Sequence, residues 1–527
     1  MPATTRRTTF LRAVSRSWLG IGVFAVAAAE AIWVAPPFSV GAVGSDSTST
    51  VLYFDRIVSG EQLELFLGTT PKPLLSLVYG PLYFAFHDWR PISWAAILAY
   101  GLAISAAALL VGRVSRSRAA GCFTATGLLA STGLLQDVSL AYAVSWALLG
   151  WSLAGLAATA KPRRYALAGA ALMLAGLARQ ETLIITVLAG ACIGAAWLRA
   201  RVRGETPPRR AWLVMIGLLA LPIGALHDWL LTRDPFYSFA IPALGSAIRA
   251  PQYANTAARI LTDHIGPSIP LLLLAIVGLA ALSVRRAWPP LIGLVALGPG
   301  VAAFLLYLGA RHTYLLERYA LPVDIAIVTA AGIGLAALAA LAVPVLAPIL
   351  EGSLRARSRG VFLAVAAVGV ALALAPTVAP LDETLLHRLD TDRQLVADFQ
   401  SAAPTIEKAL RGISRVRDMP SVRNPDDVTP PAKPALLLPA RVYPMAAVQF
   451  ELPLTQVARL EPSRVNGTGS YPSAGQIVMH DRMVDLPASR SRFMEVDRPT
   501  REGLLRLVPL LANPLRGLWV LRIEPQA

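Results

Sequence analysis

Residues 91–118 read PISWAAILAYGLAISAAALLVGRVSRSR, an apolar run that ends directly in Arg113, Arg116 and Arg118. Such a run is long enough to cross a lipid bilayer, which takes about 20 apolar residues in a helix. The same order, an apolar run followed by a basic cluster, recurs at 161–164, 199–210, 285–286 and 355–359. Positive charge is retained on the cytoplasmic side during membrane insertion, so the pattern predicts one common side for all these clusters.

The bulk composition supports a membrane protein. The 527 residues have a mean hydropathy of +0.55, with 55% hydrophobic and 15% charged residues, which is typical of a polytopic membrane protein. The net charge of +16 falls mostly in the loops between apolar runs. It therefore indicates orientation and contact with membrane lipids, and no nucleic-acid binding is expected. Cys122 and Cys192 lie within apolar segments and are expected to be small buried thiols.

Hydropathy predicts an all-α polytopic domain followed by a smaller domain. About eleven spanning helices are expected, near 18–38, 91–112, 119–136, 138–160, 165–178, 182–198, 211–231, 268–284, 288–308, 320–348 and 360–380. An odd number of spans places the N-terminus inside and the C-terminal region outside the cell. The expected divisions are a cytoplasmic tail at 1–17, the transmembrane domain at 18–380 and an extracytoplasmic domain at 381–527.

The segments assigned to the exterior hold most of the polar residues of interest. The first exterior loop, 39–90, is expected to contain an interfacial helix over 50–67 and a second interfacial or re-entrant helix over 73–86. Gln136 and Asp137 are expected to form a tight exterior turn. In the C-terminal domain, a polar helix at 381–418 and β-like runs at 435–438, 447–452, 476–479 and 518–523 predict an α/β-like fold.

The exterior face combines carboxylates with basic residues at helix ends. Glycosyl transfer from a lipid-phosphate donor requires this mixture. A carboxylate takes the proton of the acceptor hydroxyl as that hydroxyl attacks the sugar. Cations neutralise the phosphate that leaves. Because the lipid tail of such a donor stays in the bilayer, the site is expected at the membrane edge.

Several short stretches, in this order along the chain, resemble motifs of the GT-C superfamily of integral-membrane glycosyltransferases, in particular its protein O-mannosyltransferase-like and aminoarabinose-transferase-like members. They are Gly44-Ser45-Asp46-Ser47, Thr69-Thr70-Pro71-Lys72-Pro73-Leu74, the run from Ala175 to Glu181, the run from Arg233 to Ser238, and Glu317-Arg318-Tyr319-Ala320-Leu321-Pro322. The resemblance covers roughly residues 18–380. Each motif alone is short, and their common placement on the exterior face adds specificity.

The resemblance implies a bacterial inner-membrane enzyme that transfers a hexose or pentose, with inversion, from a polyprenyl-phosphate donor to an envelope glycan, lipid or protein. It implies Asp46 as the general base, with Lys72, Arg179 and Arg318 contacting the donor phosphate. Arg311 is added to these cations because an exterior arginine departs from the charge rule. Further candidate site residues are Asp55, Glu181, Asp234, Tyr237, Glu317 and Tyr319. Asp46 stands alone where many members of the superfamily carry paired acids. No metal site is therefore expected, although Asp46 and a second carboxylate could hold Mg or Mn.

Each assignment has a structural alternative. Asp46 could cap a helix, Lys72 could only reach toward the membrane interface, and Arg179 with Glu181 could form a structural ion pair. At the level of the whole chain, the alternatives are a transporter or flippase of a lipid-linked envelope precursor and a non-catalytic envelope assembly protein. A transporter is expected to carry charged residues on broken helices near the bilayer midplane.

Overall fold

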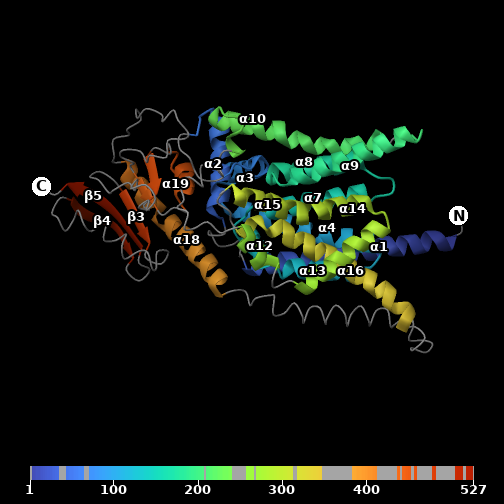
Figure 1. The fold of residues 1–527 in the computed structure, drawn as a ribbon. Helices are drawn as coiled ribbons and strands as arrows, with labels where there is room; N and C mark the ends of the chain where they lie inside the picture. Colours follow the sequence, from blue (N-terminus) through green and yellow to red (C-terminus); the bar gives the residue numbers. More distant parts are fainter. Residues whose placement is uncertain are drawn as a thin grey trace.

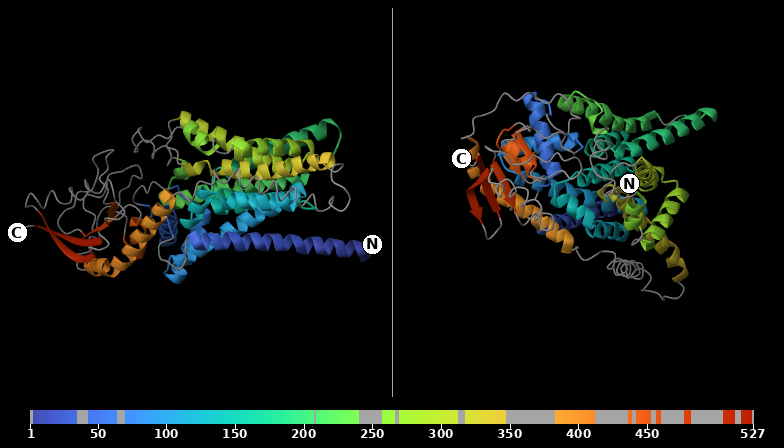
Figure 2. Two further views of the ribbon diagram at one scale, coloured as in Figure 1. Left: turned by 90° about the horizontal axis from the view of Figure 1, so that it is seen from below. Right: turned by 60° about the vertical axis from the view of Figure 1, so that its left-hand side comes forward.

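The structure is a computed structural model, and it describes residues 3–34, 43–63, 70–206, 209–239, 257–265, 269–311, 317–346, 383–411, 436–438, 442–452, 456–459, 477–481, 505–513 and 518–525. These residues form a helical bundle with a smaller sheet-containing domain at one end (Figure 1). The first helix, α1 (Ala3–Val34), begins at the opposite end of the bundle from that domain (Figure 2).

The bundle consists of apolar helices that run between its two ends. Within the described residues, five stretches are long and apolar enough to cross a membrane, and a sixth is added if a pair of helices bent by 113° counts as one span. The first half of the bundle contains α2 (Ser45–Ser59), α3 (Pro73–Phe86), α4 (Arg90–Ser115), α5 (Arg118–Leu129), α6 (Thr132–Ser139), α7 (Val144–Ala158), α8 (Tyr165–Ala178) and α9 (Thr182–Val202). The second half contains the 3-10 helix η1 (Arg209–Leu219), α10 (Ala220–Thr232), α12 (Ala257–Ile265), α13 (Ile269–Val284), α14 (Trp288–Val295), the π-helix η4 (Ala296–Gly300), α15 (Val301–Ala310) and α16 (Leu321–Leu346).

Glycines allow the buried helices to approach one another closely. A Cβ on Gly278 of α13 would lie 2.0 Å from the Ala330 carbonyl oxygen, and one on Gly334 of α16 would lie 1.9 Å from that of Leu274. Any side chain at either position would force α13 and α16 apart. Small residues at helix interfaces are a common means of packing in membranes, where burial against lipid supplies little driving force between helices.

The helices follow the predicted spans in part. The span predicted at 119–136 is divided between α5 and α6, and the one predicted at 138–160 becomes helical as α7 only from Val144. The predicted turn at Gln136 and Asp137 is wrong, because both residues lie within α6. Ser131 accepts a hydrogen bond from the Leu134 amide and begins this short helix, and the chain reverses after it, at 140–143. Cys122 and Cys192 are free thiols on exposed positions of the bundle, so the prediction of burial is also wrong. Apolar side chains on the outer face of a membrane bundle meet lipid, and thiols are tolerated there. The span predicted at 360–380 lies outside the described residues, and the total of eleven spans stays a prediction.

The C-terminal domain contains a five-stranded mixed sheet in the order β2-β1-β3-β5-β4. Its strands are β1 (Leu436–Leu438), β2 (Val457–Arg459), β3 (Ile477–Asp481), β4 (Leu505–Asn513) and β5 (Leu518–Pro525). Strands β2 and β3 pair with β1 in parallel, whereas β5 pairs with β3 and β4 in antiparallel fashion. Helix α18 (Glu383–Arg411) also belongs to this domain.

One predicted strand of this domain is a helix. Residues 447–452 were expected in a strand, but α19 (Tyr443–Gln449) covers their first part. Pro444 lies in the first turn of α19, where a missing amide proton costs no helical hydrogen bond. Met445, Ala446 and Val448 are buried, and α19 packs against α2 of the bundle. The bundle and the domain therefore meet at α2.

Candidate active site

The start of α2 places Asp46 at the end of the bundle that faces the C-terminal domain. Gly44 is the N-cap of α2, so Asp46 lies inside the first turn and does not occupy the cap position. The Gly44 amide donates to the Leu140 carbonyl at 2.9 Å, and Ser47 Oγ donates to the carbonyls of Leu140 and Ala141 at 2.9 and 2.7 Å. A side chain at position 44 would collide with Tyr142, since its Cβ would lie 2.6 Å from that ring. The loop at 140–142 thus fixes the position of Asp46.

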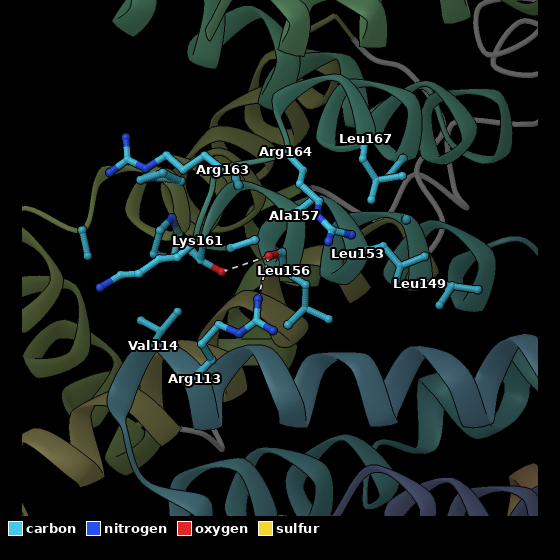
Figure 3. Close-up of a pocket in the computed structure, with 18 of the residues that line it drawn as sticks. Arg113, Val114, Leu149, Leu153, Leu156, Ala157, Lys161, Arg163, Arg164 and Leu167 are labelled. Atoms are coloured by element: carbon cyan, nitrogen blue, oxygen red, sulfur yellow. Dashed lines mark hydrogen bonds between the residues drawn. The ribbon is translucent and has the colours of Figure 1, made fainter. Parts of the chain in front are cut away.

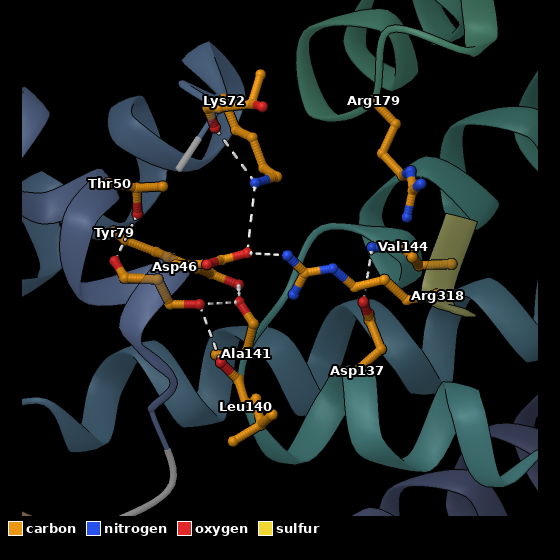
Figure 4. Close-up of polar contacts among 12 residues, drawn as sticks. Asp46, Thr50, Lys72, Tyr79, Asp137, Leu140, Ala141, Val144, Arg179 and Arg318 are labelled. Atoms are coloured by element: carbon orange, nitrogen blue, oxygen red, sulfur yellow. Dashed lines mark hydrogen bonds and ion pairs between the residues drawn. The ribbon is translucent and has the colours of Figure 1, made fainter. Parts of the chain in front are cut away.

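Two cations from distant parts of the chain meet the Asp46 carboxylate (Figure 4). Arg318 Nη2 lies 2.7 Å from Asp46 Oδ2, and Lys72 Nζ lies 3.9 Å from the same oxygen. Lys72 is the N-cap of α3, and Arg318 lies in the 3-10 turn Glu317–Tyr319 that precedes α16. The side chains of Asp46, Lys72 and Arg318 are 16, 21 and 31% exposed, so the group is partly open to a ligand.

A second ion pair lies beside the first. Arg179, the C-cap of α8, binds Glu181 through Nη2 to Oε1 at 2.6 Å and through Nε to Oε2 at 3.3 Å. The Arg179 guanidinium lies 6.0 Å from the Tyr319 ring centroid, and that of Arg318 lies 4.8 Å from the Tyr142 centroid. Such contacts between guanidinium groups and rings hold the cations in place through the ring quadrupole. The structural ion pair weighed for Arg179 and Glu181 is therefore present.

The pKa shifts reflect burial and the mixed charges of this cluster. Burial lowers the pKa of Lys72, an effect that neighbouring Asp46 opposes and the charges of Arg318 and Arg179 reinforce. Burial alone would lower the pKa of Arg318, but Asp46, together with Tyr142, Tyr319 and Asp137, outweighs it and raises that pKa. Burial alone would raise the pKa of Glu181, but the pair with Arg179 holds it below its ordinary value. The neighbouring charges thus favour the charged forms of Arg318 and Glu181, whereas burial disfavours the charged form of Lys72.

Sequence reasoning missed the role of Asp137. Its side chain is 3% exposed and accepts hydrogen bonds from the Val144 and Ser145 amides, at 3.1 and 3.0 Å, and from Ser145 Oγ at 3.1 Å. Asp137 therefore binds the free amides at the N-terminus of α7, and its charge also acts on Arg179 and Arg318. An aspartate seven residues before a helix carries no local sequence signal for this role.

Two of the predicted site residues, Asp55 and Asp234, lie outside the cluster around Asp46. Asp55 pairs with Arg56 at 3.2 Å near the other end of α2. Burial raises the pKa of Asp55, although the charge of Arg56 acts against that rise. Asp234 accepts a hydrogen bond from the Phe236 amide at 2.8 Å within the turn that follows α10. The ion pairs described for Asp46 include neither residue.

The remaining candidates divide between the cluster and other parts of the bundle. Tyr319 contributes to the cluster through its ring, as described. Tyr237 is buried beside Ser238, whose amide and hydroxyl both bind the Asp228 carboxylate at 2.8 Å. Arg311 is exposed at the C-cap of α15, and none of the ion pairs described for the cluster involves it. The side chain of Glu317 lies outside the described part of the chain.

No metal-binding group is found within the described residues. Nowhere among them do three or more His, Cys, Asp or Glu side chains come close enough together to hold a metal ion. The cluster instead offers one acceptor oxygen pair on Asp46 and several N–H donors directed at the same space. It can bind an anion through Lys72 and the guanidinium groups while a carboxylate lies within reach of a nearby hydroxyl.

Solved structures of known proteins share this architecture, whereas no protein-family model and no curated protein sequence matches the chain. The structure of ArnT from Cupriavidus metallidurans without ligand superimposes with a TM-score of 0.51 at 16% identity, covering 99% of this chain and 98% of that one. The same protein bound to undecaprenyl phosphate gives a TM-score of 0.51 at 17% identity, covering 97% of each chain.

A third structure is the Archaeoglobus fulgidus oligosaccharyltransferase tethered to an acceptor peptide. It gives a TM-score of 0.52 at 12% identity, covering 95% of this chain and 74% of that one. At these identities the likeness is one of fold. ArnT, the aminoarabinose transferase, and the oligosaccharyltransferase are both GT-C glycosyltransferases. The resemblance predicted from the short motifs is therefore confirmed at the level of the fold: the chain is a membrane protein with a GT-C-like fold.

Proposed function

We propose that the chain is an inverting glycosyltransferase that moves a hexose or pentose from a polyprenyl-phosphate donor to an acceptor on the exterior face of a bacterial cytoplasmic membrane. The observation that carries the proposal is the meeting of Asp46 with Lys72 and Arg318, beside Arg179, at one end of an apolar bundle. A carboxylate among cations at the membrane edge is what transfer from a lipid phosphate requires.

In the proposed reaction, an acceptor hydroxyl attacks the anomeric carbon of the sugar. The bond from that carbon to the phosphate oxygen breaks, and its electron pair leaves with the polyprenyl phosphate. The hydroxyl proton passes to the Asp46 carboxylate. Lys72, Arg318 and Arg179 stabilise the negative charge that develops on the leaving phosphate. One displacement at the anomeric carbon inverts its configuration.

Arg318 has a double role in this scheme. Without donor, its guanidinium binds Asp46 at 2.7 Å, which stabilises the carboxylate and makes it a weaker base. A guanidinium has five N–H donors and prefers the two-point contacts that phosphate offers. When the donor phosphate engages Arg318, its hold on Asp46 weakens and the carboxylate becomes a stronger base. Donor binding thus prepares the base for the acceptor.

The placement of the charged groups favours transfer over transport. Asp46 lies in the first turn of α2, Lys72 precedes α3, Arg179 follows α8 and Arg318 precedes α16. These groups gather at helix ends, whereas a transporter is expected to bind its substrate near the middle of the bundle. The C-terminal domain lies at the same end and reaches α2, where Arg56 Nη2 donates to the Leu452 carbonyl at 3.2 Å. We assign acceptor contact, for an envelope glycan, lipid or protein, to the space between the two.

The test is a transfer assay with the purified full chain in lipid nanodiscs and a panel of undecaprenyl- and decaprenyl-phosphate sugars. The expected result is transfer from at least one donor, which Asp46→Asn lowers about 100- to 10,000-fold. Asp55→Asn is the matched control, because Asp55 lies on the same helix and also pairs with an arginine, and it should retain activity. Full activity of a folded Asp46→Asn protein would contradict the assignment of the base. Failure to bind any polyprenyl phosphate would contradict the donor class.

A further inference from the structure

A second site lies at the opposite end of the bundle from Asp46. A cavity of about 1480 Å³ has its basic end there, between α4, α7, α8 and the start of α14, and it extends along α7 as far as Leu74 of α3. Helix α8 shows that the two ends are distinct, because it begins next to the basic residues at 161–164 and ends at Arg179 in the Asp46 cluster. Pockets for drug-sized molecules measure roughly 300–1,000 Å³, so the cavity is large enough for a lipid.

Basic residues from three separate segments line this cavity. Figure 3 labels Arg113, Lys161, Arg163 and Arg164 among them. The α4–α5 loop and its flanks supply Arg113, Arg116 and Arg118, the α7–α8 loop supplies Lys161, Arg163 and Arg164, and the segment before α14 supplies Arg286. No carboxylate is among the described residues that line the cavity. The rule that positive charge stays on the cytoplasmic side explains why each loop is basic. It does not require that three loops direct their charge to a single space.

The rest of the cavity is apolar and elongated. Leu149, Leu153 and Leu156 line it from α7, and Leu167 and Leu174 line it from α8. The lining reaches from Ala158 to Trp146 along α7, which corresponds to about 18 Å at 1.5 Å per residue. This length exceeds the ~15 Å that half of the ~30 Å hydrocarbon core provides. An acyl chain can therefore lie against the leucines while its headgroup stays at the basic end.

The backbone at two of the arginines supports a role for their side chains. Arg116 and Arg286 have φ angles of 60° and 52°, in the left-handed region that glycine adopts with least strain. Arg116 is the C-cap of α4, a position where glycine is the usual residue. Residues in strained conformations gather at functional sites. Both arginines line the cavity, where a long cation can reach a bound anion.

We propose that this cavity binds an anionic glycerophospholipid from the leaflet at the basic end, with the lipid phosphate held by Arg116, Arg164 and Arg286. Basic pockets between transmembrane helices on the cytoplasmic side bind anionic headgroups in this way. The long apolar lining favours a ligand with an acyl chain. Because no carboxylate is among the described lining residues, the arginines favour a headgroup with negative charge. The headgroup site at the basic end is separate from the Asp46 cluster, whereas the far end of the cavity, lined by Leu74 and Trp146, extends toward that cluster. Lipid binding at the basic end does not depend on glycosyl transfer.

The experiment measures lipid binding to the purified full chain by native mass spectrometry, with dioleoylphosphatidylglycerol and dioleoylphosphatidylcholine as probes. The test variant carries Arg116→Gly, Arg164→Ala and Arg286→Gly. The two glycines suit the backbone at their positions, so the fold is expected to persist. The control carries Arg199→Ala, Arg201→Ala and Arg203→Ala, which removes equal charge from exposed positions in the last turn and at the C-cap of α9, outside the cavity lining.

The expected result is a preference of the wild-type chain for phosphatidylglycerol that the test variant loses by about a hundredfold, or about fivefold for each arginine. The control should keep the preference. Equal loss in test variant and control would overturn the proposal, since the effect would then be one of general surface charge. A wild-type chain that prefers undecaprenyl phosphate to phosphatidylglycerol at this cavity would also overturn it. If the test variant does not fold, a variant with lysine at the same three positions should bind phosphatidylglycerol as the wild type does, and failure to do so overturns the proposal.

Discussion

The pair of Asp46 and Arg318 offers a double-mutant cycle that separates catalysis from structure. The 2.7 Å contact joins side chains that are 16 and 31% exposed. Breaking a fully buried pair costs roughly 3–5 kcal/mol, so partial exposure makes a loss of about 2 kcal/mol in the free energy of unfolding reasonable for Asp46→Asn. Removing a general base lowers kcat by about 100- to 10,000-fold. The loss of activity should therefore far exceed what the loss of stability explains.

The cycle compares wild type, Asp46→Asn, Arg318→Gln and the double variant. If Asp46 is the base, Asp46→Asn lowers kcat by a similar factor with and without Arg318→Gln. Arg318→Gln itself lowers kcat and raises KM for the donor, because Arg318 contacts the phosphate before and during its departure. The double variant should regain part of the lost stability, because neither Asp46 nor Arg318 is then left charged without its partner, and only the contact of Lys72 with Asp46 is still lost. Transfer kinetics and thermal unfolding are measured on the same preparations. If Asp46→Asn has no effect on kcat once Arg318→Gln is present, Asp46 only positions Arg318 and the assignment of the base is refuted.

Three further predictions concern the neighbouring charges. Burial lowers the pKa of Lys72 from 10.5 in the folded chain. At pH values between this lowered pKa and 10.5, Lys72 therefore carries its proton in the unfolded chain and not in the folded one. As pH rises through that range, the free energy of unfolding should increase, and KM for the donor should also increase because Lys72 loses its charge. Lys72→Arg should move the rise in KM to higher pH. The pair with Arg179 lowers the pKa of Glu181 from 4.5 in the folded chain. The ion pair therefore contributes fully to the free energy of unfolding above pH 4.5, and this contribution is lost as pH falls through the lowered pKa. Glu181→Gln should abolish this acid dependence of the unfolding temperature and cost about 3 kcal/mol, which Arg179→Gln in the same chain should partly restore. Arg56→Ala should destabilise the contact with the C-terminal domain by about 2 kcal/mol and speed hydrogen exchange in α19, whereas unchanged exchange would show that Arg56 does not hold the domain.

Hydropathy predicts most of the helices, because span length depends on a property that sums over many residues. The α6–α7 region shows where this fails. Ser131 begins a new helix inside what reads as one apolar span, and the 113° bend that follows depends on Asp137 holding the start of α7. That contact is tertiary, so no local pattern predicts it. The resulting turn at 140–142 then sets the position of Asp46.

The candidate site also shows which residues can be assigned from the sequence and which depend on tertiary packing. Motif order alone pointed to Lys72 and Arg318, and the structure places both against Asp46. Asp55 could have been set aside from the sequence, because nine residues at about 100° each put it on the opposite face of α2 from Asp46. Arg311 could not have been set aside in the same way, because its distance from the cluster depends on where α15 ends. Which cations reach a common anion site is decided by packing.

Helix α2 has a mechanical consequence. It carries Asp46 in its first turn, and near its last turn Arg56 holds the backbone of the C-terminal domain. The two residues are ten positions apart, or about 15 Å along a single unbroken helix. A rod of this length does not bend appreciably, so a tilt of the outer domain against the bundle moves the carboxylate with it. In the proposed reaction, the position of the base therefore depends on how the C-terminal domain lies against the bundle.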